Sequence, residues 1–449
     1  MLTFSYMSIK PQLKYFDLTM ITVSLVIGVG IFRTPAIVAQ HAGSPAVFFA
    51  AWIFGGVVSL CGALTFAEIG SRLPVAGGYY KIFSATYHPV YAFMLNWAQV
   101  VINSASAAGV AIIGAEYIRP VLFDDVTESY WQVKGVAMTI ILVLFFLNYS
   151  GIKMGARTQN LLSVLKILLI LIFCLAIFFP AHVSNAPNVG FDNFSWSGLL
   201  SAFGVSLISV FFTFGGYQNT VNFGADIADA KRQIPRAIFT GISIVLVLYL
   251  LLNVAYYHVL GFVGLQQSNL VASDLASALF GSVGGKITSV VLFVSVLGFL
   301  NTSLLSNPRV YYAMAEEKTL PSIFMKVNSK KQVQEFALAF FVALMMISLF
   351  VADRIESIIN FVILTDSLAL ASAGAAIFIL RKKSKDISHD GYQIKWYPLV
   401  PLVFMLALLF VTFNVIVSDP QNALKGSAVF FGGFPLYFLL KKLIDKGNK

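Results

Sequence analysis

The sequence GVGIF at residues 28–32 interrupts the first long apolar segment of this chain, and FTFGGY at residues 212–217 interrupts the sixth. Glycine has no Cβ, so these stretches can leave helical geometry and let another group approach the backbone. If the segments cross a membrane, such irregular backbone must be buried in protein or line a cavity. Two glycine-broken segments in the two halves of a chain therefore predict one shared binding cavity, as in a transporter.

The composition indicates that these segments lie in a lipid bilayer. The 449 residues are 58% hydrophobic and 11% charged, with a mean hydropathy of +0.83, whereas soluble domains carry about 25% charged residues. The net charge of +10 does not indicate a nucleic-acid partner, because the basic residues stand at segment ends and form no run interleaved with aromatic residues. The first apolar stretch is too long for a cleaved signal peptide, so we expect it to remain in the membrane.

Apolar segments of about 20 residues or more, the length that a helix needs to cross the hydrocarbon core, follow one another along the whole chain. We predict an all-α integral membrane protein with one transporter domain and twelve transmembrane helices, of which helices 1 and 6 are broken. The segments span residues 17–40, 45–70, 86–118, 132–150, 157–180, 198–225, 235–262, 284–314, 335–352, 356–380, 396–417 and 423–443. An amphipathic stretch at 269–281 predicts a short extra helix, either over the vestibule or as an ordinary loop helix.

The distribution of Lys and Arg orients the chain in the cell membrane. With the N-terminus in the cytoplasm, most of the 30 basic residues fall in cytoplasmic loops, as the positive-inside rule requires. Both termini are therefore expected to be cytoplasmic. Helices 1 and 6 cross in opposite directions, so the chain is predicted to hold two inverted five-helix repeats, at 17–180 and 198–380, followed by two additional helices at 396–443.

The first break offers polar backbone groups of both kinds. The outer half-helix begins near Gly30, and its N–H groups favour a carboxylate, whereas the carbonyls near Ile27 would accept from an ammonium group. Together they describe a zwitterion, although glycine pairs in membrane helices also serve close helix packing. The candidate substrate-binding residues are Ile27, Gly28, Val29, Gly30 and Ile31.

The second break combines flexible backbone with aromatic surface. Gly215 and Gly216 free the backbone, and the carbonyls of Phe212 and Thr213 could accept from an ammonium group. Aromatic residues in membrane helices usually pack, so neither Phe212 nor Phe214 is diagnostic alone. The candidate substrate-binding residues here are Phe212, Thr213, Phe214, Gly215 and Gly216.

Three ionisable residues within the predicted spans are singled out as candidates for function. Lys166 stands about ten residues, roughly 15 Å, inside the fifth span, and an ionisable group at that depth is a functional hypothesis by default. Its ammonium would reach carbonyls freed by the first break, where a sodium ion could otherwise bind, or it would snorkel to the interface. Three roles are open for Asp366: a proton site, a substrate contact or a polar packing residue. Arg33 lines the outer pathway or pairs with an acid.

Signatures of an enzyme are absent from the sequence. It contains no HExxH, GxxxxGK[ST], GxSxG or CxxC motif, which would indicate metal, phosphate or nucleophile chemistry. The histidines show no metal-ligand spacing, and no metal or cofactor is predicted. Cys61 and Cys174 lie in apolar segments and are expected to be reduced packing residues.

Several stretches make the chain resemble the amino acid–polyamine–organocation (APC) superfamily, in particular the bacterial relatives of L-type amino acid transporters. They are spread over most of the first 240 residues, and one more lies in the eighth span. The stretches are VIGVGIFRTP at 26–35, AEIGSRLPVAGGYY at 67–80, YAFMLNWAQ at 91–99, GARTQNLLSVLK at 155–166, FFTFGGYQNTVNFGA at 211–225, IPRAI at 234–238 and NTSLLSNPRVYYAM at 301–314.

This resemblance implies alternating access, an α-amino acid substrate and a five-plus-five inverted-repeat fold. By motif match, the backbone of residues 28–31 would hold the substrate carboxylate, and the carbonyls of Ile27 and Phe212 would hold its ammonium group. Phe212 matches the family's gating aromatic residue. Lys166 matches the lysine that bridges helices 1 and 8 in sodium-independent members, and Ser303 would be its partner in helix 8.

The chain departs from the family pattern at a few positions. Val29 stands where many members have Ser or Thr, and Arg33 replaces a small or apolar residue, so the side chain that is transported is not fixed by the motifs. The loop at 119–131 has no cysteine, so no disulfide-linked partner subunit is expected. The sequence leaves the oligomeric state open.

The functional prediction is a membrane carrier without enzymatic activity. We expect sodium-independent transport of α-amino acids, preferably neutral, by exchange or by proton coupling. A cationic amino acid or polyamine carrier remains an alternative because of Asp366. A sodium symporter of the same fold, or a non-transporting receptor or channel, would explain parts of the pattern; sodium dependence and counterflow distinguish these possibilities.

Overall fold

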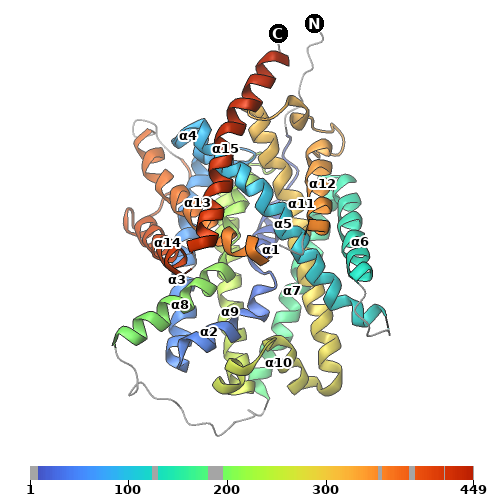
Figure 1. Ribbon diagram of the computed structural model, residues 1–449, viewed down its shortest axis with the longest axis vertical. Helices are drawn as coiled ribbons and strands as arrows, with labels where there is room; N and C mark the ends of the chain where they lie inside the picture. Colours follow the sequence, from blue (N-terminus) through green and yellow to red (C-terminus); the bar gives the residue numbers. More distant parts are fainter. Residues whose placement is uncertain are drawn as a thin grey trace.

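The structure is a computed structural model that describes residues 9–123, 130–179, 196–351, 356–383, 390–418 and 420–447. The described part is helical, and its only β-type pairing consists of two isolated bridges, Leu13 with Ile227 and Ala76 with Phe223. Most helices run roughly along the long axis of the molecule (Figure 1). We call the end at which α4 and the end of α15 lie the basic end; α2 and α10 lie at the opposite end.

The first predicted break is present, and it divides one apolar segment into two helices. The chain leaves α1 (Tyr15–Val26) at Ile27, whose ψ of 91° is extended, forms one 3₁₀ turn, η1 (Gly30–Phe32), and resumes as α2 (Thr34–Ala42). Pro35 favours this restart because the missing N–H of a proline costs nothing in the first turn of a helix. Gly43, with φ of +67°, ends α2, and the Ser44 side chain caps α3 (Pro45–Arg72).

The second break is present but begins later than predicted. α8 (Trp196–Phe214) stays helical through Phe212 and Thr213, and the chain unwinds only at Gly215 before the 3₁₀ helix η4 (Tyr217–Asn222). Gly216 has φ of +119°, which a residue with a Cβ rarely adopts. A Cβ on Gly216 would also lie 2.1 Å from the carbonyl oxygen of Leu25. Glycine is therefore needed for the two breaks to touch.

The remaining helices complete the bundle. A helix begins or continues in each predicted apolar segment, and α10 confirms the short helix expected at 269–281, whereas α4 is a separate helix that the hydropathy pattern did not predict. Their bounds are α4 (Gly78–Thr86), α5 (Pro89–Leu122), α6 (Tyr130–Tyr149), α7 (Ile152–Cys174), η2 (Leu175–Phe178), α9 (Ala230–Gln267), α10 (Val271–Phe280), η5 (Gly281–Val283), α11 (Gly284–Glu316), η6 (Ser322–Met325), α12 (Glu335–Val351), α13 (Glu356–Lys383), α14 (Leu399–Ser418) and α15 (Pro420–Gly447).

Eight helices in the described part are long and apolar enough to cross a membrane. Together with the large apolar residues that remain exposed on their outer faces, they define a multi-pass membrane protein, since a soluble protein rarely leaves such extended apolar surface in water. α1, α12 and α14 contribute shorter apolar stretches. The composition argument is thus confirmed at the level of fold class.

Two apolar clusters divide the interior. The larger cluster joins residues of α1, α2, α3, α8 and α9, and it also includes buried residues of α5, α11 and α13, such as Ala92, Leu305 and Ala373. The second cluster is formed by α5, α6, α11 and α12.

Ion pairs hold α4 against the end of α11, because Lys81 pairs with Glu316 at 2.8 Å and with Glu317 at 2.9 Å. Burial lowers the pKa of Lys81, but these two carboxylates outweigh it and raise the pKa above its ordinary value.

Gly216→Ala should destabilise the folded protein by at least about 2 kcal/mol, because the new methyl group meets the Leu25 carbonyl and the backbone dihedral is strained. Thermal unfolding of the purified protein in detergent measures this loss. Gly135→Ala is the matched control: a Cβ there meets nothing within 4 Å, so its melting temperature should stay unchanged or rise slightly. Equal melting temperatures for the two variants would contradict the close contact between the breaks.

Candidate substrate site at the two helix breaks

The two breaks, far apart in sequence, face each other inside the larger cluster. A Cβ on Gly30 would lie 3.4 Å from the Thr213 side chain, so the first break packs against the last turn of α8. The Thr213 hydroxyl lies 3.0 Å from the hydroxyl of Thr34 and 2.8 Å from the carbonyl of Ser209. This contact ties α8 to the start of α2. The structure therefore brings together the two groups of residues that the sequence singled out.

The first break leaves backbone donors unused. The N–H of Gly28 donates to the Val26 carbonyl at 2.9 Å. By contrast, the N–H groups of Val29, Gly30 and Ile31 have no hydrogen-bond acceptor among the described residues. Consecutive free N–H groups at the start of a helix form a site for an anion. Gly28 has open space around its Cβ position, so nothing beside it blocks a small ligand.

Lys166 occupies the position next to the first break that its depth predicted. Its side chain is 1% exposed, and its Nζ donates to the Ser24 hydroxyl at 2.9 Å and to the Ile27 carbonyl at 2.7 Å. The ammonium thus replaces the N–H partner that the Ile27 carbonyl lost when α1 ended. It does not snorkel to an interface. A buried ammonium is tolerated only with such partners.

The partner of Lys166 on α11 differs from the one expected. Ser303 is not among the hydrogen-bond partners of Lys166 in the part of the chain that the structure describes. Instead α11 approaches the lysine at Gly298, where a Cβ would lie 2.5 Å from Cε and 2.6 Å from Nζ. The absence of a side chain at position 298 makes room for the ammonium. Ser303 uses its carbonyl to accept from Asn307 at 2.9 Å.

Tyr249 of α9 connects the two breaks, and sequence reasoning missed it. Its hydroxyl donates to the Val26 carbonyl at 3.0 Å and lies 3.5 Å from the Thr213 carbonyl. Phe214 is fully buried and packs between Tyr249 and Trp52, with ring centroids 5.1 Å and 5.9 Å apart. A tyrosine in a long apolar helix carries no pattern that reveals this role. Only its position opposite both breaks does so.

The carbonyls expected to bind an ammonium group are partly engaged. The Ile27 carbonyl accepts from Lys166, and the Phe212 carbonyl accepts from the N–H of Gly215 at 3.2 Å. Each carbonyl oxygen has two lone pairs, so each keeps one for a substrate. The side chain of Phe212 is 55% exposed, so in this conformation its ring is not buried against the other break.

The remaining candidates lie apart from these contacts. Asp366 of α13 accepts a hydrogen bond from the Gln99 amide of α5, and Arg33 is exposed next to η1. Among the described residues no cluster of His, Cys, Asp or Glu has the arrangement of a metal site. A small cavity lies between α6, α11 and the residues before α12, and its lining includes Asn148, Arg309 and Gln334 but none of the residues of the breaks.

A helical membrane protein with two opposed, interrupted helices and unpaired backbone groups between them has the architecture of a secondary transporter. The chain belongs to the amino acid permease family, whose model matches residues 13–439. This confirms the predicted resemblance and the predicted class, an amino acid carrier. The family is one of transporters, in agreement with the absence of enzyme motifs.

Individual relatives cover nearly the whole chain. The serine/threonine exchanger SteT of Bacillus subtilis is 30% identical, over 95% of this chain and 96% of its own length. The large neutral amino acids transporter small subunit 2 of Rattus norvegicus is 28% identical, over 96% of this chain and 81% of its own length. The human cystine/glutamate transporter is 29% identical, over 93% of this chain and 83% of its own length.

Tyr249→Phe should lower stability by about 1 kcal/mol and slow transport, because the Val26 and Thr213 carbonyls lose a shared donor. Tyr256→Phe is the matched control, since the Tyr256 hydroxyl on the same helix is buried without a partner and its removal should not reduce stability. Thermal unfolding and initial uptake rates in proteoliposomes measure both effects. If both variants behave like the wild-type protein, Tyr249 does not hold the breaks.

Proposed function

We propose that this chain is a sodium-independent exchanger of neutral α-amino acids that works by alternating access in the cell membrane. The observation that carries the proposal is the row of three free N–H groups at residues 29–31, with a buried ammonium, that of Lys166, bonded to the end of α1. A carboxylate is the ligand that such a row favours. The names of two relatives, an exchanger of serine and threonine and a transporter of large neutral amino acids, support the substrate class.

The substrate would lie between the breaks with its charged ends on backbone groups. Its carboxylate would accept from the N–H groups of Val29, Gly30 and Ile31. Its ammonium group would donate to the remaining lone pairs of the Ile27 and Phe212 carbonyls. Phe212 would close over the bound molecule, because its exposed ring stands on the last turn of α8. Backbone groups recognise what all α-amino acids share, so selectivity would rest on neighbouring side chains.

Sodium independence follows from the placement of Lys166. Its ammonium is already bonded to the Ser24 hydroxyl and the Ile27 carbonyl, two oxygen atoms of the kind that a sodium ion would need. A second cation there would be repelled at short range in a medium of low dielectric constant. The lysine therefore places its amino group at the end of α1, and transport needs no bound sodium ion.

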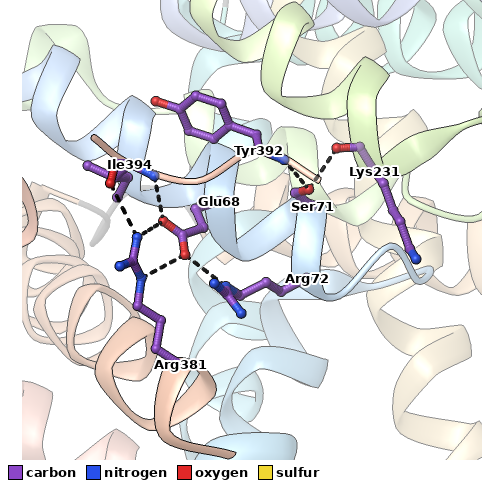
Figure 2. Close-up of polar contacts among 7 residues, drawn as sticks. All are labelled: Glu68, Ser71, Arg72, Lys231, Arg381, Tyr392 and Ile394. Carbon is purple, nitrogen blue, oxygen red and sulfur yellow. Dashed lines mark hydrogen bonds and ion pairs between the residues drawn. The ribbon is translucent and has the colours of Figure 1, made fainter. Parts of the chain in front are cut away.

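We further propose the finer architecture that the hydropathy pattern predicts. Twelve spans would form inverted repeats at 17–180 and 198–380, followed by two helices at 396–443. The pairing of a broken first helix with a broken sixth supports this assignment. Arg72 at the end of α3, Lys231 at the start of α9 and Arg381 at the end of α13 lie near one another (Figure 2), and these basic residues support a cytoplasmic location for the basic end and for both termini. Cys61 and Cys174 are free cysteines inside helices, so we propose no disulfide-linked subunit.

Purified protein in proteoliposomes loaded with unlabelled serine should accumulate radiolabelled serine or leucine by counterflow, equally in sodium and in sodium-free buffer. Arginine and glutamate serve as competitors, because they carry the same α-amino and α-carboxyl groups but a charged side chain. Saturable counterflow distinguishes a carrier from a receptor or channel. A requirement for sodium would contradict the role given to Lys166, and preferential exchange of arginine would favour the cationic alternative.

Lys166→Ala should abolish most counterflow while the protein remains folded. The substitution leaves the Ile27 carbonyl and the Ser24 hydroxyl without their donor, and the inner end of the first break is no longer positioned. Initial rates, together with size-exclusion profiles and thermal unfolding, separate loss of transport from loss of folding. Near-normal uptake by this variant would reject a mechanistic role for the lysine.

A further inference from the structure

A buried chain of side-chain hydrogen bonds links α6, α11, α7 and α1. Nδ2 of Asn148, in the last turn of α6, donates to Oδ1 of Asn301 of α11 at 2.7 Å. Nδ2 of Asn301 donates to Oε1 of Gln159 of α7 at 2.8 Å, and Nε2 of Gln159 donates to the Ser163 hydroxyl at 3.1 Å. That hydroxyl donates to the Met20 carbonyl of α1 at 2.9 Å. All four side chains are buried, so the chain is shielded from solvent.

Two backbone carbonyls fix the direction in which this chain donates. Nδ2 of Asn148 lies 2.8 Å from the Leu144 carbonyl, and Nδ2 of Asn301 lies 3.2 Å from the Gly155 carbonyl. A carbonyl oxygen can only accept, so the atom that faces it must be a nitrogen. Exchanging oxygen and nitrogen in either amide would set two acceptors against each other. The chain therefore starts with an acceptor, Oδ1 of Asn148.

The acceptor at the start of the chain is buried and has no donor. Oδ1 of Asn148 has no hydrogen-bond partner among the described residues, and neither has Nε2 of Gln334, just before α12. The two residues are 3% and 1% exposed. Both line the small cavity described above. Because one atom accepts and the other donates, a molecule that does both and lies between them would satisfy the pair.

The cavity has the size and the enclosure that suit one water molecule. Its volume is about 10 Å³, near the smallest volume that holds one water. The residues that line it are all buried. Apolar side chains, among them Ile152, Leu304 and Leu338, form much of the wall, so the hydrogen bonds of a bound molecule must go to the few polar groups.

Arg309 of α11 also lines the cavity, and its pairing argues for a neutral ligand. Its Nε and Nη2 donate to the Asp226 carboxylate at 2.7 and 2.8 Å, and its Nη1 donates to the Leu305 carbonyl. Since Asp226 already balances the guanidinium charge, an anion would find no free counter-charge and would meet Oδ1 of Asn148. A cation would be repelled by the guanidinium. Of the five N–H groups of an arginine, these contacts use only three.

A closed turn holds Gln334 at the cavity. The N–H of Asn328 donates to the Val333 carbonyl at 3.0 Å, which closes the turn before α12. The Lys331 carbonyl accepts from the N–H of Ile152, at the start of α7, at 3.0 Å. The turn is thus fixed both to itself and to α7. The position of the Gln334 amide is therefore set by the fold and not by a free loop.

We propose that this cavity binds one water molecule, which donates to Oδ1 of Asn148 and accepts from Nε2 of Gln334. An unengaged N–H of Arg309 is the further donor available in the lining, and buried waters make about three hydrogen bonds. The water becomes the first member of the chain that ends on the Met20 carbonyl. Hydrogen bonds then run without interruption from the segment before α12, through α6, α11 and α7, to α1. The site does not depend on the proposed function, because it serves the fold.

Gln334→Met tests the water by the sign of its effect on stability. With a water in the cavity, the substitution removes one of its hydrogen bonds and should lower the melting temperature by about 1 °C or more. In a dry cavity the same substitution would remove an unsatisfied buried donor, and the melting temperature would stay unchanged or rise. The second result would overturn the site.

Tyr311→Phe is the matched control for this measurement. The Tyr311 hydroxyl on α11 is buried without a partner, and Tyr311 does not line the cavity. Its removal should leave the melting temperature unchanged or raise it. Opposite signs for the two variants distinguish a donor that binds a water from a donor that binds nothing. A loss of the same size in both variants would contradict the proposal, because it would show that the loss in Gln334→Met needs no water.

A crystal or cryo-EM map that shows ordered waters tests the site directly, even if Gln334→Met does not fold. A single density peak should lie within hydrogen-bond distance of Oδ1 of Asn148 and Nε2 of Gln334. A cavity without density would overturn the proposal. Crystals grown in bromide separate water from an anion, since an anomalous peak at this position would show an anion and rule the water out. Neither measurement requires transport, so a protein that fails to exchange amino acids leaves the site testable.

Discussion

A backbone N–H or C=O that leaves a helix inside a bilayer has no water to replace its lost partner, and this constraint shapes the centre of the molecule. The Ile27 carbonyl receives the Lys166 ammonium, and the Val26 carbonyl receives the Tyr249 hydroxyl. The protein thus satisfies the acceptors at the end of α1. It leaves the N–H donors of residues 29–31 without a partner in the described part of the chain. Because the break has satisfied acceptors but free donors, it favours a negatively charged group.

Three glycines make this arrangement possible, each by leaving space for a particular group. Gly30 faces the Thr213 side chain, Gly216 faces the Leu25 carbonyl, and Gly298 faces the Lys166 ammonium. The first two bring the breaks together, and the third lets a charged side chain end between α1 and α11. The glycines therefore do more than permit unwinding, since they set the distances at which the polar groups meet.

Polar groups at the basic end serve a different purpose. There the ionised pairs link neighbouring segments of the chain. Glu68 of α3 pairs with Arg381 of α13, whereas Arg309 of α11 pairs with Asp226, which follows η4. Since apolar contact is non-directional, such directional pairs fix how these segments are aligned.

The sequence by itself determined the membrane class, the positions of most helices and the approximate places of the two breaks, because hydropathy and glycine act locally along the chain. It also identified Lys166, since a charge within an apolar span is conspicuous. The roles of Tyr249 and Gly298, the shifted start of the second break and the lysine's actual partners were decided only by the tertiary structure. These features depend on hydrogen bonds and close contacts between residues distant in sequence, and no local pattern encodes which side chain will stand opposite a given carbonyl.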